Sequence, residues 1–135
     1  MYCLDTNIVV FALNRRRPAL AQRLDAELNA RTRLIVPVVV LFELDYGIAK
    51  CDRRDSSRAT LDSFLAAGFE TPAFDAKDAR EAGDIRADLE RRGTPIGPYD
   101  IFIAAQARRR GAALVTLNRR EFSRIPGLLV ADWES

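Results

Sequence analysis

Short apolar runs alternate with longer amphipathic segments along this chain of 135 residues. The apolar runs predict strands at residues 2–4, 34–36, 113–116 and 128–131, with a further short strand within 69–74 that Pro72 weakens. Apolar residues at helical spacing predict helices at 7–13, 19–30, 37–50, 54–67, 75–92, 99–110 and 118–122. Strands separated by helices pair in parallel through right-handed crossovers. The pattern therefore predicts an α/β fold, a three-layer α/β/α sandwich with a central parallel sheet.

The length of the chain fits a single domain over residues 1–135, which can fold without a disulfide or a metal staple. The two cysteines, Cys3 and Cys51, make no disulfide framework, and the opening segment MYCLDTNIVVFAL lacks the basic start of a secretory signal. No apolar run approaches the roughly 20 residues of a membrane span. We therefore expect a cytoplasmic protein that does not enter a membrane.

The chain contains no histidine, which removes several classes of chemistry. Ser-His-Asp and Cys-His catalysis, histidine general bases and histidine zinc sites are all excluded. Neither GxGxxG nor GxxxxGK[ST] occurs, so the common nucleotide-binding loops are absent as well. If the chain is an enzyme, its chemistry depends on carboxylates, with a hard cation bound through oxygen.

Three acidic residues stand where the predicted fold would bring them to one edge of the sheet. Asp5 follows the first strand, Glu43 lies within VVVLFELDYGIA, and Asp100 precedes IFIAAQA. Each alone has an ordinary explanation as a helix cap, a surface glutamate or a first-turn acid. A helix that is apolar all round is predicted to be buried, however, and a glutamate there is costly unless it is paired or binds a metal. Acids converging at the carboxyl ends of parallel strands would repel one another, and Mg²⁺ or Mn²⁺ would relieve that repulsion.

Four segments of the chain resemble the PIN domain and, more narrowly, the VapC-type ribonuclease toxins of bacterial toxin–antitoxin pairs. They are LDTN at 4–7, PVVVLFELDYG at 37–47, GTPIGPYDIFIAAQA at 93–107 and LVTLNRREFSRIPGLLVADW at 114–133. The resemblance implies a PIN-like endoribonuclease that depends on Mg²⁺ (or Mn²⁺), with Asp5, Glu43 and Asp100 as its catalytic, metal-binding acids. It also implies an RNA substrate, a cognate VapB-type antitoxin, a homodimer and a higher toxin–antitoxin assembly.

The resemblance is incomplete near the end of the strand predicted at 113–116. The family often has a fourth acid there, whereas this chain has Thr116 and Asn118, with Glu121 close by as a candidate substitute. This departure leaves the binding of a second metal open. Thr6 and Asn7 resemble the polar residues that orient the first aspartate or a bound water.

Two arginine triplets are candidate RNA contacts, because guanidinium groups bind phosphates through paired hydrogen bonds. The triplets are Arg15, Arg16 and Arg17, and Arg108, Arg109 and Arg110. The alternative is that both triplets are solvated helix ends.

Two helices carry more apolar surface than one small sheet can cover. The residues concerned are Val9, Val10, Phe11, Leu13, Leu41, Phe42 and Leu44. The surplus indicates a self-complementary interface or a groove for an amphipathic helix, and the alternative is that these side chains are core.

Other functions fit parts of the same pattern. A housekeeping RNA-processing PIN nuclease would carry the same acids. A catalytically inactive PIN-like module would act by binding alone, although the intact trio of acids weighs against it. A haloacid-type phosphatase needs a second aspartate where Asn7 stands, and a receiver domain needs a late lysine, whereas the last lysine here is Lys77.

Overall fold

The computed structural model describes residues 1–134, and within them it contains a single sheet of four strands. The strands are β1 (Tyr2–Leu4), β2 (Leu34–Ile35), β3 (Ala113–Val115) and β4 (Leu129–Ala131). Their order across the sheet is β2-β1-β3-β4, and every neighbouring pair is parallel. The two central strands, β1 and β3, are therefore the first and third along the chain.

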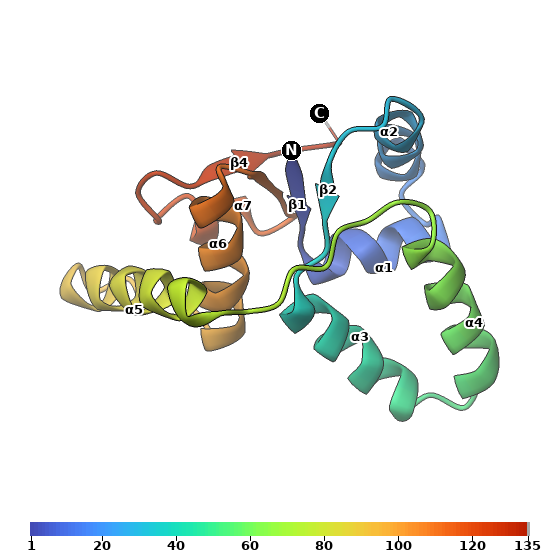
Figure 1. The fold of residues 1–135 in the computed structure, drawn as a ribbon, viewed down its shortest axis with the longest axis horizontal. Helices are drawn as coiled ribbons and strands as arrows, with labels where there is room; N and C mark the ends of the chain where they lie inside the picture. Colours follow the sequence, from blue (N-terminus) through green and yellow to red (C-terminus); the bar gives the residue numbers. More distant parts are fainter. Residues whose placement is uncertain (135) are drawn as a thin grey trace.

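Seven helices connect and cover these strands within residues 1–134. They are α1 (Thr6–Asn14), α2 (Pro18–Asn29), α3 (Val38–Ala49), α4 (Arg54–Leu65), α5 (Ala76–Arg91), α6 (Pro98–Arg110) and α7 (Arg119–Phe122). In Figure 1, α5 and α6 lie on one side of the strands, and α1, α2 and α4 lie on the other. The predicted α/β sandwich with a parallel sheet is confirmed. No helix of the described residues is long and apolar enough to cross a membrane.

The strand predicted within residues 69–74 is wrong in its extent. Glu70 forms an isolated parallel bridge to β2: its N–H donates to the carbonyl of Leu34 (2.8 Å), and its carbonyl accepts from the N–H of Val36 (2.9 Å). Pro72, two residues further on, has no N–H with which to continue the ladder. The segment therefore adds one bridge to the edge of the sheet.

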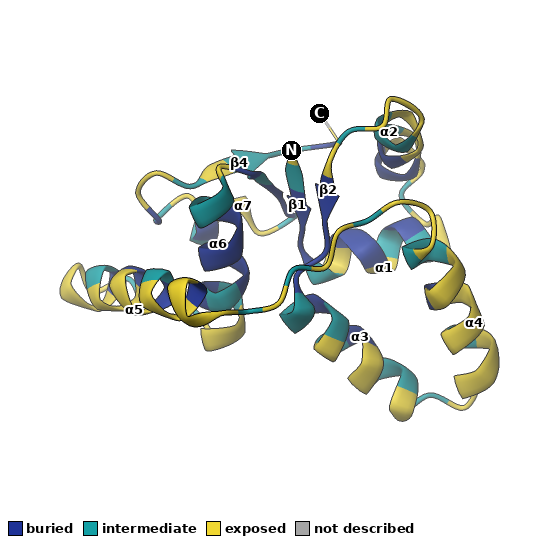
Figure 2. Cartoon of the chain, viewed as in Figure 1, coloured by how far each residue is buried: buried dark blue, intermediate teal, exposed yellow. Residues whose placement is uncertain are grey.

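Helix α6 is the central helix of the molecule, as its apolar sequence predicts. Its buried residues are Ile101, Ile103, Ala104, Ala105, Gln106 and Ala107. In Figure 2 the buried residues gather along α6 and the strands, whereas α4 and α5 expose long faces. Pro98 opens α6 and Gly111, with a left-handed φ of 67°, ends it. Asp100 is thereby held in the first turn of a helix that cannot shift without disturbing the core.

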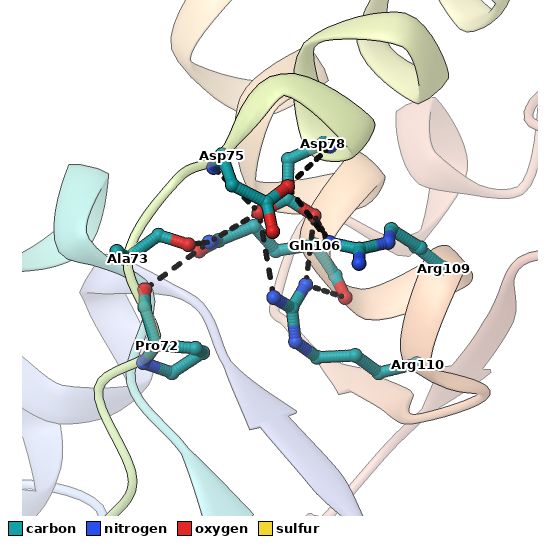
Figure 3. A network of polar contacts seen from close by, with 7 residues as sticks. All are labelled: Pro72, Ala73, Asp75, Asp78, Gln106, Arg109 and Arg110. Atoms are coloured by element: carbon teal, nitrogen blue, oxygen red, sulfur yellow. Dashed lines mark hydrogen bonds and ion pairs between the residues drawn. The ribbon is translucent and has the colours of Figure 1, made fainter.

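A buried carboxylate, Asp78, fastens α5 to α6 (Figure 3). Its Oδ1 accepts from the guanidinium groups of Arg109 (2.8 Å) and Arg110 (2.9 Å), and its Oδ2 accepts from the amide of Gln106 (3.1 Å). Asp75 and Asp78 also cap each other's backbone N–H at the start of α5. Burial by itself raises the pKa of Asp78, but these hydrogen bonds outweigh it and hold that pKa well below its usual range.

We expect Asp78→Asn to lower the free energy of unfolding by about 3 kcal/mol at pH 7, because two guanidinium groups lose a buried counter-charge. Chemical denaturation measures this change. Asp84→Asn, an exposed acid on the same helix, is the matched control and should cost less than about 0.5 kcal/mol. Folding lowers the pKa of Asp78, so the difference between wild type and variant should shrink as the pH falls below about 4. Equal stabilities at pH 7 would contradict this account.

Candidate functional site

The carboxyl ends of β1 and β3 place Asp5 beside Thr116. Leu4 and Val115 are paired in register, so the residue after each strand leaves the sheet at the same edge. The hydroxyl of Thr116 donates to Oδ2 of Asp5 (2.7 Å), and the N–H of Thr6 donates to Oδ1 (2.8 Å). Asp5 is therefore both the cap of α1 and part of the sheet edge, with both carboxylate oxygens held.

Glu43 reaches the same edge from α3. The hydroxyl of Thr6 donates to its Oε1 (2.8 Å), so α1 contacts both acids through one residue. The prediction that the apolar segment around Glu43 is buried on all sides is wrong. Phe42 is 52% exposed and Tyr46 is 59% exposed, and Glu43 itself is half-buried. Helix α3 covers the core with one face and presents aromatic side chains to solvent with another.

Asp100 and Glu121 complete a group of four acids, which we call the acid edge: Asp5, Glu43, Asp100 and Glu121. Burial raises the pKa of Asp100 to about 6, with repulsion from Asp5, Glu121 and Glu43 as the further causes. Burial also raises the pKa of Asp5, although the hydrogen bonds from the threonine hydroxyl and backbone act against it. Asp5, Glu43 and Glu121 therefore each lie close enough to Asp100 for their negative charges to raise its pKa.

The departure from the family pattern at Asn118 has a structural consequence. The side-chain amide of Asn118 donates to Oε2 of Glu121 (2.7 Å), and its backbone N–H donates to the hydroxyl of Thr116 (3.0 Å). Asn118 thus links the threonine that holds Asp5 to the fourth acid. Asn7, the remaining predicted supporting residue, is exposed at the start of α1.

The donor chemistry of the acid edge fits a hard divalent cation, because every ligand it offers is an oxygen. No salt bridge among the described residues reaches any of its four acids, so their charge has no cationic partner there. As the side chains lie, no three acidic or cysteine side chains within residues 1–134 are arranged to hold one ion. Glu43 and Glu121 are instead turned toward the neutral donors Thr6 and Asn118. The negative charge and the oxygen ligands of the acid edge therefore suit a metal ion, but the carboxylates are not oriented to coordinate one ion together.

The second arginine triplet is engaged by acids of α5. Arg108 pairs with Glu81 (2.5 Å), and Arg109 and Arg110 both pair with the buried Asp78. These three guanidinium groups are also largely covered, with side-chain exposures of 20 to 27%. A role for them in binding RNA stays a prediction, and these ion pairs weigh against it.

The first arginine triplet is more accessible. Arg15 pairs with Asp25 (3.4 Å) and Arg17 with Glu134 (2.6 Å), both as partly exposed ion pairs, and Arg16 is exposed. Exposed pairs of this kind contribute little to stability and exchange readily with other ions. Contact of this triplet with RNA also stays a prediction.

The apolar residues predicted to exceed the core divide into two groups. Val9 and Leu44 are buried, so the core explanation holds for them. Val10 and Phe42 are exposed, and the others, Phe11, Leu13 and Leu41, are partly buried against the core. The ring of Phe42 meets that of Tyr99 edge-on, with 5.5 Å between their centroids. An exposed aromatic pair therefore stands next to the acid edge, since each ring directly precedes one of its acids.

Comparison with known proteins identifies the family. Residues 2–128 match the model of the PIN domain. The chain is 38% identical over 132 residues to the tRNA(fMet)-specific endonuclease VapC of Salmonella typhimurium, with 98% of this chain and 97% of that protein covered. It is also 38% identical over 135 residues to ribonuclease VapC2 of Rickettsia felis, with 99% and 98% covered. The chain therefore belongs to the PIN-domain family, among its VapC proteins.

Solved structures agree with this assignment. A crystal structure of VapBC2 from Rickettsia felis bound to a promoter DNA fragment matches with a TM-score of 0.89 and 34% identity, covering 98% of each chain. DNA-bound VapBC from Salmonella typhimurium matches with a TM-score of 0.88 and 36% identity, covering 98% of this chain and 97% of that one. Both similarities extend over nearly the whole of this chain.

We expect Asp100→Asn to stabilise the metal-free protein at pH 8 by about 1 kcal/mol, because it removes an ionised carboxylate that its neighbours repel. The value is modest because water screens a half-exposed group. Folding raises the pKa of Asp100 to about 6. The folded wild type is therefore destabilised, relative to the variant, as the pH rises from about 4 through 6 and Asp100 becomes ionised. The advantage of the variant should therefore vanish near pH 4. Thermal melts in EDTA measure it, and an unstable variant at pH 8 would refute the repulsion.

Proposed function

We propose that this chain is a Mg²⁺-dependent endoribonuclease that acts in the cytoplasm as the toxin of a type II toxin–antitoxin pair. The observation that carries the proposal is the acid edge, a group of four acids with no cationic partner among the described residues, in a chain of the PIN family. Two of these acids, Asp5 and Asp100, have raised pKa values. Relatives named as ribonucleases support RNA as the substrate. VapBC complexes among the similar structures favour a toxin over a housekeeping RNA-processing nuclease.

Asp5, Glu43 and Asp100 would hold the ion, and Glu121 is available as a further ligand. The ion, when bound, lowers the pKa of a water molecule and offsets the charge of the scissile phosphate. Thr116 keeps Asp5 oriented through its hydroxyl at 2.7 Å. Glu43 and Glu121 would exchange their neutral hydrogen-bond donors for the cation. Binding alone does not require four acids that repel one another at one edge of the sheet. We therefore favour an enzyme over an inactive binding module.

We expect cleavage of single-stranded RNA to require Mg²⁺ or Mn²⁺ and to stop in EDTA. Asp5→Asn and Asp100→Asn should each lower the rate by several orders of magnitude without unfolding the protein, because each removes a charged ligand of the ion. Asp84→Asn, at an exposed acid in the middle of α5 and outside the acid edge, should leave the rate unchanged. In parallel, Mg²⁺ should raise the melting temperature of the wild type more than that of Asp100→Asn. Cleavage that persists in EDTA would refute the proposal.

The partner that we propose is a VapB-type antitoxin, docked on the apolar face that α3 shares with its neighbours. A cavity of about 340 Å³ lies between α1, α3 and α4, and Leu13, Leu44, Ile48 and Leu61 form the apolar part of its lining. The rest of the lining is polar, and it includes Arg53 and Thr60. An amphipathic helix could bury its apolar face there. Glu43 lies on the same helix as Leu44 and Ile48, so a basic residue of the partner could reach the acid edge and take the place of the cation. We also propose that the chain forms a homodimer and enters a higher toxin–antitoxin assembly.

We expect light scattering at micromolar concentration to give the mass of a dimer, and a clean monomer mass would count against it. The C-terminal segment of the cognate antitoxin should inhibit cleavage as an isolated peptide. Neutralising its basic residue should relieve inhibition while the peptide still binds, because the apolar docking persists. Undiminished inhibition by the neutral peptide would show that the block is steric.

A further inference from the structure

A polar pocket adjoins the acid edge at the carboxyl end of β3. Its volume is about 310 Å³, and it is lined by Arg17, Thr116, Leu117, Arg119, Asp132 and Glu134. Thr116 lines the pocket and donates its hydroxyl to Asp5, so the pocket and the acid edge are linked through this residue. The volume lies at the lower end of the range for pockets that hold small ligands. A ligand group in this pocket would therefore sit next to the proposed metal site.

Two guanidinium groups reach the pocket from distant parts of the chain. Arg17 directly precedes α2, and its guanidinium carbon lies over the ring of Phe11, 4.7 Å from the ring centroid. Arg119 opens α7 on the other side. Their side chains are 42% and 57% exposed, so both can be approached from solvent. The fold therefore brings together two accessible cations beside a group of acids.

Both guanidinium groups are paired with carboxylates of the segment that follows β4. Arg17 contacts Oε1 of Glu134 at 2.6 Å, and Arg119 contacts Oδ2 of Asp132 at 3.4 Å. The N–H of Glu134 donates to the other oxygen of Asp132 (2.8 Å), which holds the two acids together. In this pocket, anionic carboxylate oxygens contact two guanidinium groups. The oxygens of a phosphodiester can make the same contacts. The side chains of Glu134 and Asp132 are 29% and 21% exposed, whereas that of Asp78 is fully buried. These pairs therefore cost less to open than the Asp78 pairs, and a phosphate can displace the acids.

We propose that this pocket binds a phosphate of the RNA substrate next to the scissile one, and that Asp132 and Glu134 occupy it until RNA displaces them. The inference rests on the proposed ribonuclease function and adds a substrate subsite to it. It also separates the members of the first arginine triplet: Arg17 contacts RNA through the pocket, whereas Arg15 pairs with Asp25 outside it. The segment after β4 thus competes with RNA and weakens its binding.

The test is fluorescence anisotropy with a short labelled single-stranded RNA in EDTA, where cleavage does not interfere. Arg17→Gln and Arg119→Gln should each weaken binding about fivefold and reduce the slope of log K against log salt by about 0.7, the value for one phosphate contact on a single strand. Glu134→Gln should tighten binding about threefold, because a competitor of the phosphate is neutralised. Thermal melts would confirm that each variant is folded.

Two variants at the exposed pair outside the pocket serve as matched controls. Arg15→Gln and Asp25→Asn change the net charge by the same amounts and should shift binding by less than about twofold. Equal effects of Arg15→Gln and Arg17→Gln would overturn the subsite, since the pocket would then act only through net charge. Unchanged or weaker binding by Glu134→Gln would overturn the competition. Failure of the wild type to cleave RNA with Mg²⁺ would refute the proposed function instead, and this binding series would still report on the pocket.

Discussion

The parallel register of β1 against β3 is the constraint on which the site depends. Leu4 stands opposite Val115, so Asp5 and Thr116 emerge at one edge and make a hydrogen bond of 2.7 Å. A shift of one residue would turn every side chain of the shifted strand to the opposite face of the sheet and separate this pair. Burial of both strands fixes the register, since their side chains are packed on two faces. The packing of the core therefore fixes the positions of Asp5 and Thr116 relative to each other.

The acids that are buried or partly buried in this chain lie in two opposite kinds of environment. Asp78 receives two guanidinium groups and an amide, and its pKa is lowered despite complete burial. Asp5 receives a hydroxyl and a backbone N–H, and its pKa stays raised. The pKa of Asp100 is raised to about 6, by burial and by repulsion from three neighbouring carboxylates. The ion pairs of Asp78 hold α5 and α6 together. Asp5 and Asp100 have no such cationic partner, so their negative charge is available to an external cation.

Hydrophobic spacing predicted the helices, the central strands and the position of Asp5 at a strand end, because these follow from local periodicity. It failed where the outcome depends on contacts distant in sequence. The strand predicted within 69–74, which Pro72 was expected to weaken, is reduced to a single bridge between Glu70 and β2. The segment around Glu43 is apolar on all sides, and yet Phe42 is half-exposed. Apolar composition alone does not distinguish a side chain that packs in the core from one that awaits a partner.

The arginine triplets show that a run of basic residues does not reveal which guanidinium groups the fold pairs with a buried acid. Arg109 and Arg110 look like a basic surface in the sequence, but the fold sets them against the buried Asp78, where their charge is needed for packing. Arg17 looks the same in the sequence and meets Glu134, a residue 117 positions away, in a half-exposed ion pair. A guanidinium group opposite a buried acid is structural because releasing it would strand a charge. A guanidinium group opposite a partly exposed acid can exchange partners at a lower cost, and this makes Arg17 the better candidate for contact with a phosphate.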